Sequence, residues 1–228
     1  MQQTPAYNVV NAELLSLVPP TIRRVIDVGC MVGTMARCIR ERFPHARVTG
    51  LDIDPDYAAT AAQHCTDAFA CDIETIQPAL WEHLFPSDCW IFGDCLEHLR
   101  DPWRILREIR ARIDPDGCLL VCLPNAQNWS VQQCLASGQF RYQDAGLMDR
   151  THLRWFTRIT LLEMLQGCGW TVQAGLSRNL PPAPRQEAVL HAIRGLAIAG
   201  GFDPEQAAAD AIPFQYVFKC APNPGSRP

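Results

Sequence analysis

The sequence predicts an α/β domain with a doubly wound, Rossmann-like parallel sheet, and three observations support this. Short apolar runs alternate with amphipathic stretches along the 228 residues. The first apolar run leads into a glycine turn, VIDVGCMVGT, and acidic residues follow the later runs. Alternating strand and helix patterns are typical of a parallel sheet covered on both faces. Ligands of such sheets bind beyond the carboxyl ends of the strands.

The first half of the chain contains the strand and helix repeats. A leading helix over Asn8–Val18, within an N-terminal segment 1–22, is expected to stop at Pro19 and Pro20. The repeats that follow are RRVIDVG with MARCIRERF, ARVTGLD with DYAATAAQHC, DAFACD with the region around ALWEHL, and DCWIFGD with DPWRILREIRARI. The turn DPDG then leads into a fifth strand, CLLVCLP.

The second half is less regular, and we expect it to belong to the same single domain, 1–228. Segment 124–158 breaks the periodicity and is interpreted as a helix and loop insertion that forms a lid over the strand ends. TRITLLEMLQGCGW resumes as a helix and WTVQAGLS as a strand. Segment 181–211 is interpreted as a second insertion, of mixed helix and loop, before a last strand in PFQYVFKCA.

Composition limits the classes of partner. There are 20 basic and 24 acidic residues, and no run of Lys or Arg could neutralise a phosphate backbone, so no nucleic acid is expected. No signal sequence and no apolar stretch of about 18 residues is visible, so we expect no membrane association and a cytoplasmic location. The eleven cysteines form no CxxC pair and are interpreted as small buried hydrophobic residues. Oligomeric state is left open.

Three aspartates follow successive predicted strands. Asp52 comes after VTGL, Asp72 after FAC and Asp94 after WIFG. Each could simply cap the next helix. Together, beside the turn of Gly29 and Gly33, they favour a nucleoside pocket, because a carboxylate accepts two hydrogen bonds from a ribose diol. The GxGxxG pattern of dinucleotide sites is absent.

At this point the sequence resembles the class I S-adenosylmethionine-dependent methyltransferases. VIDVGCMVG resembles their first motif, VTGLDID their ribose-binding strand, ACDIE their adenine segment, and FGDCLEHLRDPWRILREI their fourth-strand motif. The resemblance covers about Val25–Val172. It implies a seven-stranded sheet whose last strand is antiparallel, and S-adenosylmethionine as the cofactor, with S-adenosylhomocysteine as product.

The resemblance also implies roles for residues of this chain. Methionine-end contacts fall on Asp27, Gly29 and Gly33, the ribose contact on Asp52, and adenine contacts on Asp72 and Ile73, while Asp94 faces the sulfonium. Cys30 and Ile53 complete the predicted cofactor-binding set. The family usually has Gly where this chain has Met31. That side chain points either into the cofactor's space or away from it, and we favour the second.

Within the family, the chain resembles the group of ubiquinone-pathway O-methyltransferases and of enzymes that modify sugars and natural products. Transfer from a sulfonium mainly requires alignment, with a base for an acceptor that must lose a proton. His98 and His152 are the candidate catalytic residues, although each could instead have a structural role. In ubiquinone-pathway relatives an acidic and histidine cluster is associated with a divalent cation. Mg²⁺ held by Asp94, Glu97 and His98 is therefore considered, but no metal ligand is predicted.

The acceptor is predicted to be a small molecule, methylated at oxygen. Aromatic residues of the insertion could wall its pocket or form the lid's own core. Arg141, Arg150, Arg154 and Arg158 could bind an acidic acceptor or pair with Asp144, Asp149 and Glu163. The alternatives are N-methylation of a small molecule, a catalytically silent module that binds a partner, and a nicotinamide-dependent oxidoreductase.

Overall fold

A computed structural model describes residues 9–225 of the chain, which contain one seven-stranded sheet. Its strands are β1 (Arg24–Val28), β2 (Arg47–Asp52), β3 (Asp67–Ala70), β4 (Cys89–Gly93), β5 (Cys118–Pro124), β6 (Trp170–Arg178) and β7 (Gln215–Pro222). The strand order is β3-β2-β1-β4-β5-β7-β6. β7 is antiparallel to both of its neighbours, and the other pairs are parallel. The predicted doubly wound sheet with an antiparallel last strand is confirmed.

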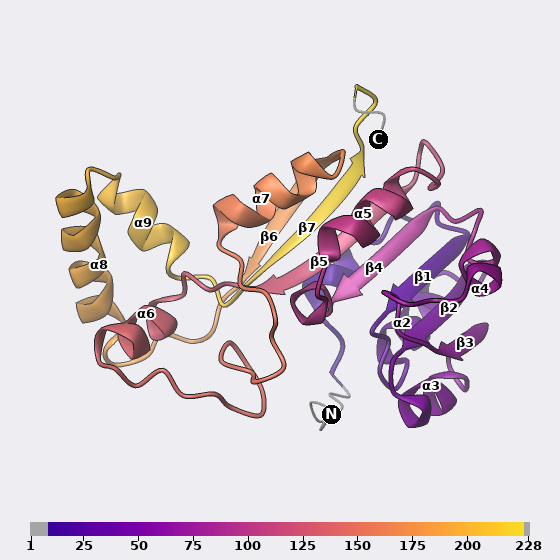
Figure 1. The fold of residues 1–228 in the computed structure, drawn as a ribbon, viewed down its shortest axis with the longest axis horizontal. Coiled ribbons are helices and arrows are strands. Elements are labelled where there is room, and N and C mark those ends of the chain that lie inside the picture. Colours follow the sequence, from indigo (N-terminus) through magenta and orange to yellow (C-terminus); the bar gives the residue numbers. More distant parts are fainter. Residues whose placement is uncertain (1–8, 226–228) are drawn as a thin grey trace.

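Helices cover both faces of the sheet (Figure 1). They are α1 (Ala12–Ser16), α2 (Thr34–Arg42), α3 (Pro55–Ala61), α4 (Pro78–His83), α5 (Pro102–Arg110), α6 (Trp129–Ala136), α7 (Arg158–Gly167), α8 (Gln186–Gly200) and α9 (Pro204–Asp210). The core on one face includes Trp90 and Phe92 of β4 with apolar residues of α5 and α7. On the other face, Val25 and Ile91 pack with residues of α1, α2 and α3.

Asp-Pro pairs begin three of the helices. In α3 and α9 the aspartate side chain accepts backbone N–H groups of the first turn, from Asp54 and Asp203 respectively. Asp101 does the same for α5. The proline that follows each aspartate needs no hydrogen-bond partner at the first helical position. The leading helix is shorter than predicted because Asn11 caps it, and Asn8 lies outside the described residues.

A lobe formed by α6, α8 and α9 stands beside the sheet, at the left of Figure 1. It has a small core of its own around Leu190 and Ile193. Two buried asparagines after β5 attach it: Asn125 Nδ2 donates to the carbonyl of Asp210 at 2.8 Å, and Asn128 Nδ2 to that of Pro213 at 2.9 Å. Segment 124–158 runs between β5 and α7 and contains α6 and a long loop. That it acts as a lid stays a prediction.

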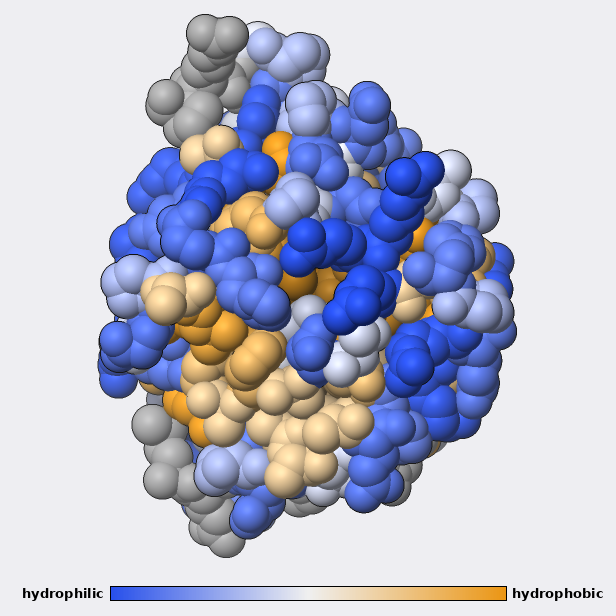
Figure 2. Space-filling view, turned by 90° about the vertical axis from the view of Figure 1, so that its right-hand side faces the viewer, coloured by the Kyte–Doolittle hydropathy of each residue, from blue (hydrophilic) through white to orange (hydrophobic). Residues whose placement is uncertain are grey.

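The opposite end of the sheet is the β3 edge. Space-filling shows this side as mostly hydrophilic, with a patch of moderately hydrophobic residues below its centre (Figure 2). Arg47 and Asp67 form an ion pair at 3.3 Å across β2 and β3. Charged side chains of this kind discourage pairing of an edge strand with another chain. In residues 9–225 no helix combines the length and apolar character needed to cross a bilayer.

Candidate functional site at the strand ends

The glycine turn after β1 is fastened to the neighbouring strand β2. The amides of Gly29 and Cys30 both donate to the carbonyl of Leu51, at 2.8 and 3.1 Å. Gly29 has φ +72°, and a Cβ there would lie 3.2 Å from the Cys95 side chain. Gly33 has φ +79°, and its Cβ would approach the Ala61 backbone to 3.0 Å. Any side chain at either position would therefore be strained.

Asp52 is the side chain that links the turn to the next helix. Its Oδ2 accepts the amide of Met31 at 2.8 Å, and its Oδ1 accepts the amide of Asp54 at 2.9 Å. The carboxyl is almost buried, and burial raises its pKa against the opposing effect of these two bonds. Capping and ligand binding are thus not exclusive here, because each carboxylate oxygen has a second lone pair.

Asp27 lies in β1 directly behind the turn and is buried. Burial first, and the charge of Asp52 second, raise its pKa to about 7. Its Oδ2 has no hydrogen-bond partner within the described chain. A buried carboxyl with an unused oxygen is costly unless a ligand supplies the donor, so Asp27 has the chemistry expected of a cofactor contact.

Met31 has a left-handed backbone, with φ +48°, and its side chain is half-buried. An L-residue there costs roughly 1 kcal/mol relative to glycine. We expect Met31→Gly to raise the free energy of unfolding by about that amount, measured by thermal unfolding. Met31→Ala is the control, because it keeps the backbone cost; an equal gain from alanine would contradict this explanation. Tighter binding of S-adenosylhomocysteine by the glycine variant would show that the side chain enters the cofactor's space.

The residues predicted to contact adenine lie beyond β3. Asp72 accepts the amide of Glu74 at 2.8 Å and so stabilises the turn after the strand. Ile73 is buried in the core below, whereas Ile53 is 58% exposed beside Asp52. An exposed isoleucine next to the predicted ribose contact provides an apolar surface on which a base could pack. Because its side chain is buried, Ile73 can contact a bound base only through its backbone, or support the site by packing in the core.

Asp94 follows β4 and has an unusual backbone for an aspartate, with φ +56°. Its Oδ1 accepts a hydrogen bond from Gln215 Nε2 of β7. Arg178 of β6 in turn donates to Gln215 and pairs with Glu13 of α1 at 3.2 Å. Partial loss of solvation at the carboxyl raises the pKa of Asp94 to about 6, although the residue as a whole is exposed. A strained residue held in this way is a candidate for function.

The two predicted catalytic histidines lie together beside Glu97. Their ring centroids are 4.9 Å apart, and His152 Nε2 lies 4.0 Å from Glu97 Oε1. Burial lowers the pKa of His98, and burial followed by His98 lowers that of His152 to about 4. Burial and the charge of Asp94 raise the pKa of Glu97 well above its usual range. At neutral pH both imidazoles are therefore uncharged, and the lowered pKa makes each a weaker base than an exposed histidine.

The loop of the insertion brings His152 to this position. Leu153 and Arg154 donate their amides to the carbonyl of Glu97, at 2.8 and 3.0 Å. His98 Nδ1 lies 3.1 Å from Thr151 Oγ1, which donates to Asp149 at 2.6 Å. No spacing in the sequence connects these residues, so sequence reasoning missed Thr151, and it missed Gln215 and Arg178 for the same reason.

Glu97, His98 and His152 also form a donor set that could hold a metal ion. One ligand atom of each lies within 4.8 Å of the others, and Glu97 Oε2 is buried without a hydrogen-bond partner. The structure places His152 in this cluster instead of the Asp94 considered from the sequence. Two imidazoles and one carboxylate suit a borderline transition ion such as Zn²⁺, which would act as a Lewis acid, better than Mg²⁺.

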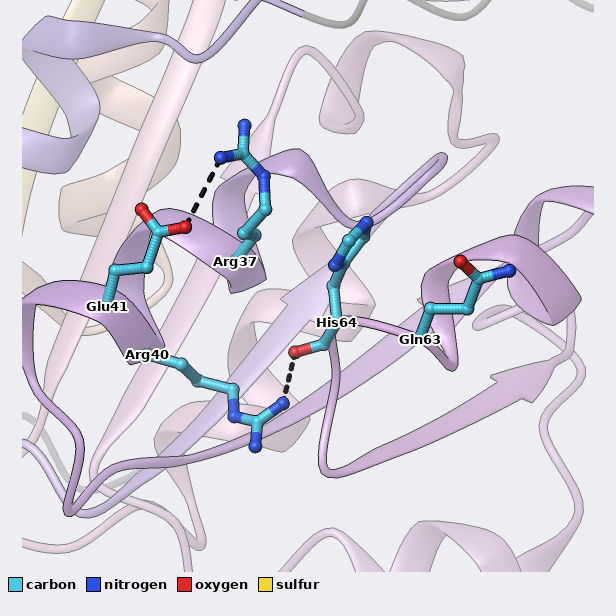
Figure 3. Close-up of a pocket in the computed structure, with 5 residues that line it drawn as sticks. All are labelled: Arg37, Arg40, Glu41, Gln63 and His64. Atoms are coloured by element: carbon cyan, nitrogen blue, oxygen red, sulfur yellow. Dashed lines mark hydrogen bonds and ion pairs between the residues drawn. The ribbon is translucent and has the colours of Figure 1, made fainter.

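A separate hollow of about 220 Å³ lies on the outer surface between α2 and the end of α3 (Figure 3). Arg37 pairs with Glu41 at 3.3 Å, and Arg40 donates to the carbonyl of His64 at 2.7 Å. Its two arginines are thus bound to neighbouring groups, and none of its lining residues belongs to the strand-end set. We therefore place the functional site at the strand ends.

Comparison with known families identifies the family of the chain. Residues 6–174 match the family model described as a methyltransferase domain. Trans-aconitate 2-methyltransferase of Klebsiella pneumoniae (strain 342) is 29% identical over 160 residues, which are 69% of this chain and 61% of that protein. The same enzyme of Escherichia coli (strain K12 / DH10B) is 29% identical over 118 residues, covering 51% and 45%. The chain thus spans about half to three fifths of these curated relatives.

Solved structures share the fold. One is the putative methyltransferase in complex with the Haloferax volcanii Trm112 methyltransferase activator, with TM-score 0.60, 15% identity, and 93% of this chain and 88% of that chain covered. Another is the O-methyltransferase from a trans-AT PKS multienzyme of Brevibacillus brevis in complex with S-adenosyl-L-homocysteine. It has TM-score 0.61 and 16% identity, and covers 94% and 72%. At these identities the likeness concerns the fold alone.

Proposed function

Because the chain belongs to the class I S-adenosylmethionine-dependent methyltransferases, we propose that it transfers a methyl group to an oxygen of a small-molecule acceptor. The observation that carries the proposal is the arrangement at the strand ends. There the turn fastened by Asp52 lies on the same edge of the sheet as two uncharged histidines, His98 and His152. Family membership also leaves no reason to retain the nicotinamide alternative.

The cofactor is proposed to lie across the ends of β1, β2 and β3. Its methionine end is proposed to contact Asp27, Gly29, Cys30 and Gly33. The Oδ2 of Asp27, which is buried without a hydrogen-bond partner in the described chain, supports this proposal. Asp52 keeps lone pairs for the ribose hydroxyls after binding the two amides. The other proposed contacts are Ile53, Asp72 and Ile73 for the base and Asp94 towards the sulfonium.

The sulfonium supplies a methyl group that is already activated, so the chain's task is alignment and proton removal. The acceptor oxygen forms its bond to the methyl carbon as the carbon–sulfur bond breaks, and the electron pair stays on sulfur. The acceptor's hydroxyl proton passes to a ring nitrogen of His98 or His152. Burial keeps both rings neutral at working pH, so a ring nitrogen is available to take the proton as the new bond forms, although the lowered pKa makes each ring a weaker base. This chemistry needs no metal.

Titration calorimetry with S-adenosylhomocysteine tests the proposal. We expect saturable binding with one site per chain, because the cofactor and its product share the adenosine and homocysteine contacts. No detectable binding at millimolar ligand would contradict the enzyme proposal. Binding without transfer to any acceptor would instead favour the silent module. Mass spectrometry of a methylated acceptor would locate the methyl group on oxygen or nitrogen.

A further inference from the structure

The strand ends carry a concentration of carboxyl groups. Five lie there: Asp27, Asp52, Asp94, Glu97 and Asp149. The Cys95 thiol lies among them, and after burial the charges of four of them raise its pKa. Glu97 in turn is influenced by the charges of Asp94 and Asp149. At neutral pH Glu97 stays protonated and Asp27 is only partly ionised, because burial raises the pKa of the first well above its usual range and that of the second to about 7. Asp52, which accepts two backbone amides, and Asp94, with a pKa of about 6, are ionised and would repel an anion that approaches them.

The bound cofactor would offset only part of this charge. Its sulfonium contributes one positive charge, and its amino-acid end is zwitterionic, so its net charge is one. Among the protein's own cations, Arg178 lowers the pKa of Asp94. Arg178 is already paired with Glu13 and donates to Gln215. The cofactor's single positive charge therefore does not offset Asp52 and Asp94 together.

The arginines of the insertion are directed elsewhere. Arg150 pairs with Asp144 at 2.6 Å, and Arg158 pairs with Asp210 at 2.7 Å. Arg154 donates to the carbonyl of Arg100 and lies 5.9 Å from the centroid of the Trp103 ring. Their expected role in binding an acidic acceptor is therefore not supported. Arg141 is exposed on the loop and remains for experimental comparison.

A run of aromatic rings leads from the histidines to the surface. His152 lies 5.9 Å from Trp155, Trp155 lies 5.7 Å from Phe140, and Phe140 lies 5.9 Å from Tyr142, measured between ring centroids. The last three rings are 36%, 37% and 63% exposed, so packing alone does not explain them. Exposed ring faces next to carboxylates attract flat and positively charged groups.

From this juxtaposition we infer that the acceptor is a ring-bearing molecule without negative charge, either uncharged or cationic, and that the site excludes polycarboxylates. This inference rests on the proposed function. The trans-aconitate 2-methyltransferase relatives are named for a tricarboxylate. We expect this chain not to accept one, since a tricarboxylate would meet like charge at the strand ends. Asp94 and the rings of Phe140, Tyr142 and Trp155 are the proposed determinants of specificity.

Three probes of matched shape test the inference: tyramine, tyrosol and 3-(4-hydroxyphenyl)propionate, which share a phenol and a two-carbon arm and end in a cation, a neutral hydroxyl and an anion. Calorimetry measures each at neutral pH, with and without S-adenosylhomocysteine. We expect the first two to bind at least about tenfold more tightly than the anion, and trans-aconitate not to bind. An anionic probe that binds as tightly as the others, or no binding by any probe, would overturn the inference.

Two substitutions distinguish the effect of charge on probe affinity from the effect of ring contact. Asp94→Asn should narrow the gap between tyramine and the anionic probe, while Tyr142→Ala should weaken all three probes alike. Arg141→Gln is the matched charge control. If it increased the affinity for tyramine by as much as Asp94→Asn decreased it, the inference would also be contradicted. The proposed function and this inference can fail separately. If S-adenosylhomocysteine does not bind but the probes keep the expected order of affinity, only the proposed function is overturned. If S-adenosylhomocysteine binds but the order of affinity is reversed, only the inference is overturned.

Discussion

Replacing Asp52 with alanine is expected to weaken S-adenosylhomocysteine binding by about 10- to 100-fold, the range expected for hydrogen bonds to a charged group. The substitution removes the acceptor for the amide of Met31 and for that of Asp54, so the turn loses its side-chain link to β2. It also removes the carboxylate proposed to bind the ribose. Titration calorimetry on the purified variant measures the effect.

Asp54→Ala provides the matched control two residues away. Asp54 caps α3 by accepting the amides of Asp56 and Tyr57 but does not accept from the turn after β1. Its loss should cost about 1 kcal/mol of stability, as for other helix caps. Cofactor affinity should change little. If both variants lost affinity equally, Asp52 would act through general destabilisation and its proposed ribose contact would be wrong.

The sheet could be predicted because its signals are local. Buried strands of a parallel sheet such as Leu119–Leu123 need continuous apolar residues, and this requirement is readable one strand at a time. Asp-Pro pairs at Asp54 and Asp101 mark helix starts for equally local reasons. The antiparallel direction of β7 was expected from the family resemblance. Its place between β5 and β6 was not predicted, since alternation of apolar runs carries no information about strand order.

The site was only partly predictable, because its geometry depends on contacts that are distant in sequence. The motif around His98 suggested a functional residue, but only the folded loop shows that Thr151 and His152 reach it. The hydrogen bond between Asp94 and Gln215 joins residues that are 121 positions apart. Sequence alone also left the insertion's arginines open between a ligand and internal ion pairs, a choice that depends on where Asp144 and Asp210 lie.

His152→Ala is expected to lower turnover by about 10²-fold or more, the usual contribution of a positioned base, while leaving affinity for S-adenosylhomocysteine unchanged. The imidazole lies between Glu97 and His98, away from the residues proposed to hold the adenosine. His191→Ala, in an exposed residue of α8, is the control and should have wild-type rates. A screen with labelled cofactor first identifies an acceptor, and turnover is then measured with that acceptor.

The pH dependence of turnover and of stability tests His152 as the base. Because burial holds the pKa of His152 at about 4, turnover should persist below pH 6.5 and fall only as pH approaches about 4. The folded-state pKa lies below the unfolded value of about 6.5, so the stability contributed by the neutral ring is present above pH 6.5. That stability is lost as pH falls through about 4, because protonation then favours unfolding. A rate that declines already around pH 6.5 would contradict a base with this lowered pKa. Full activity in both His152→Ala and His98→Ala would show that transfer depends on alignment alone.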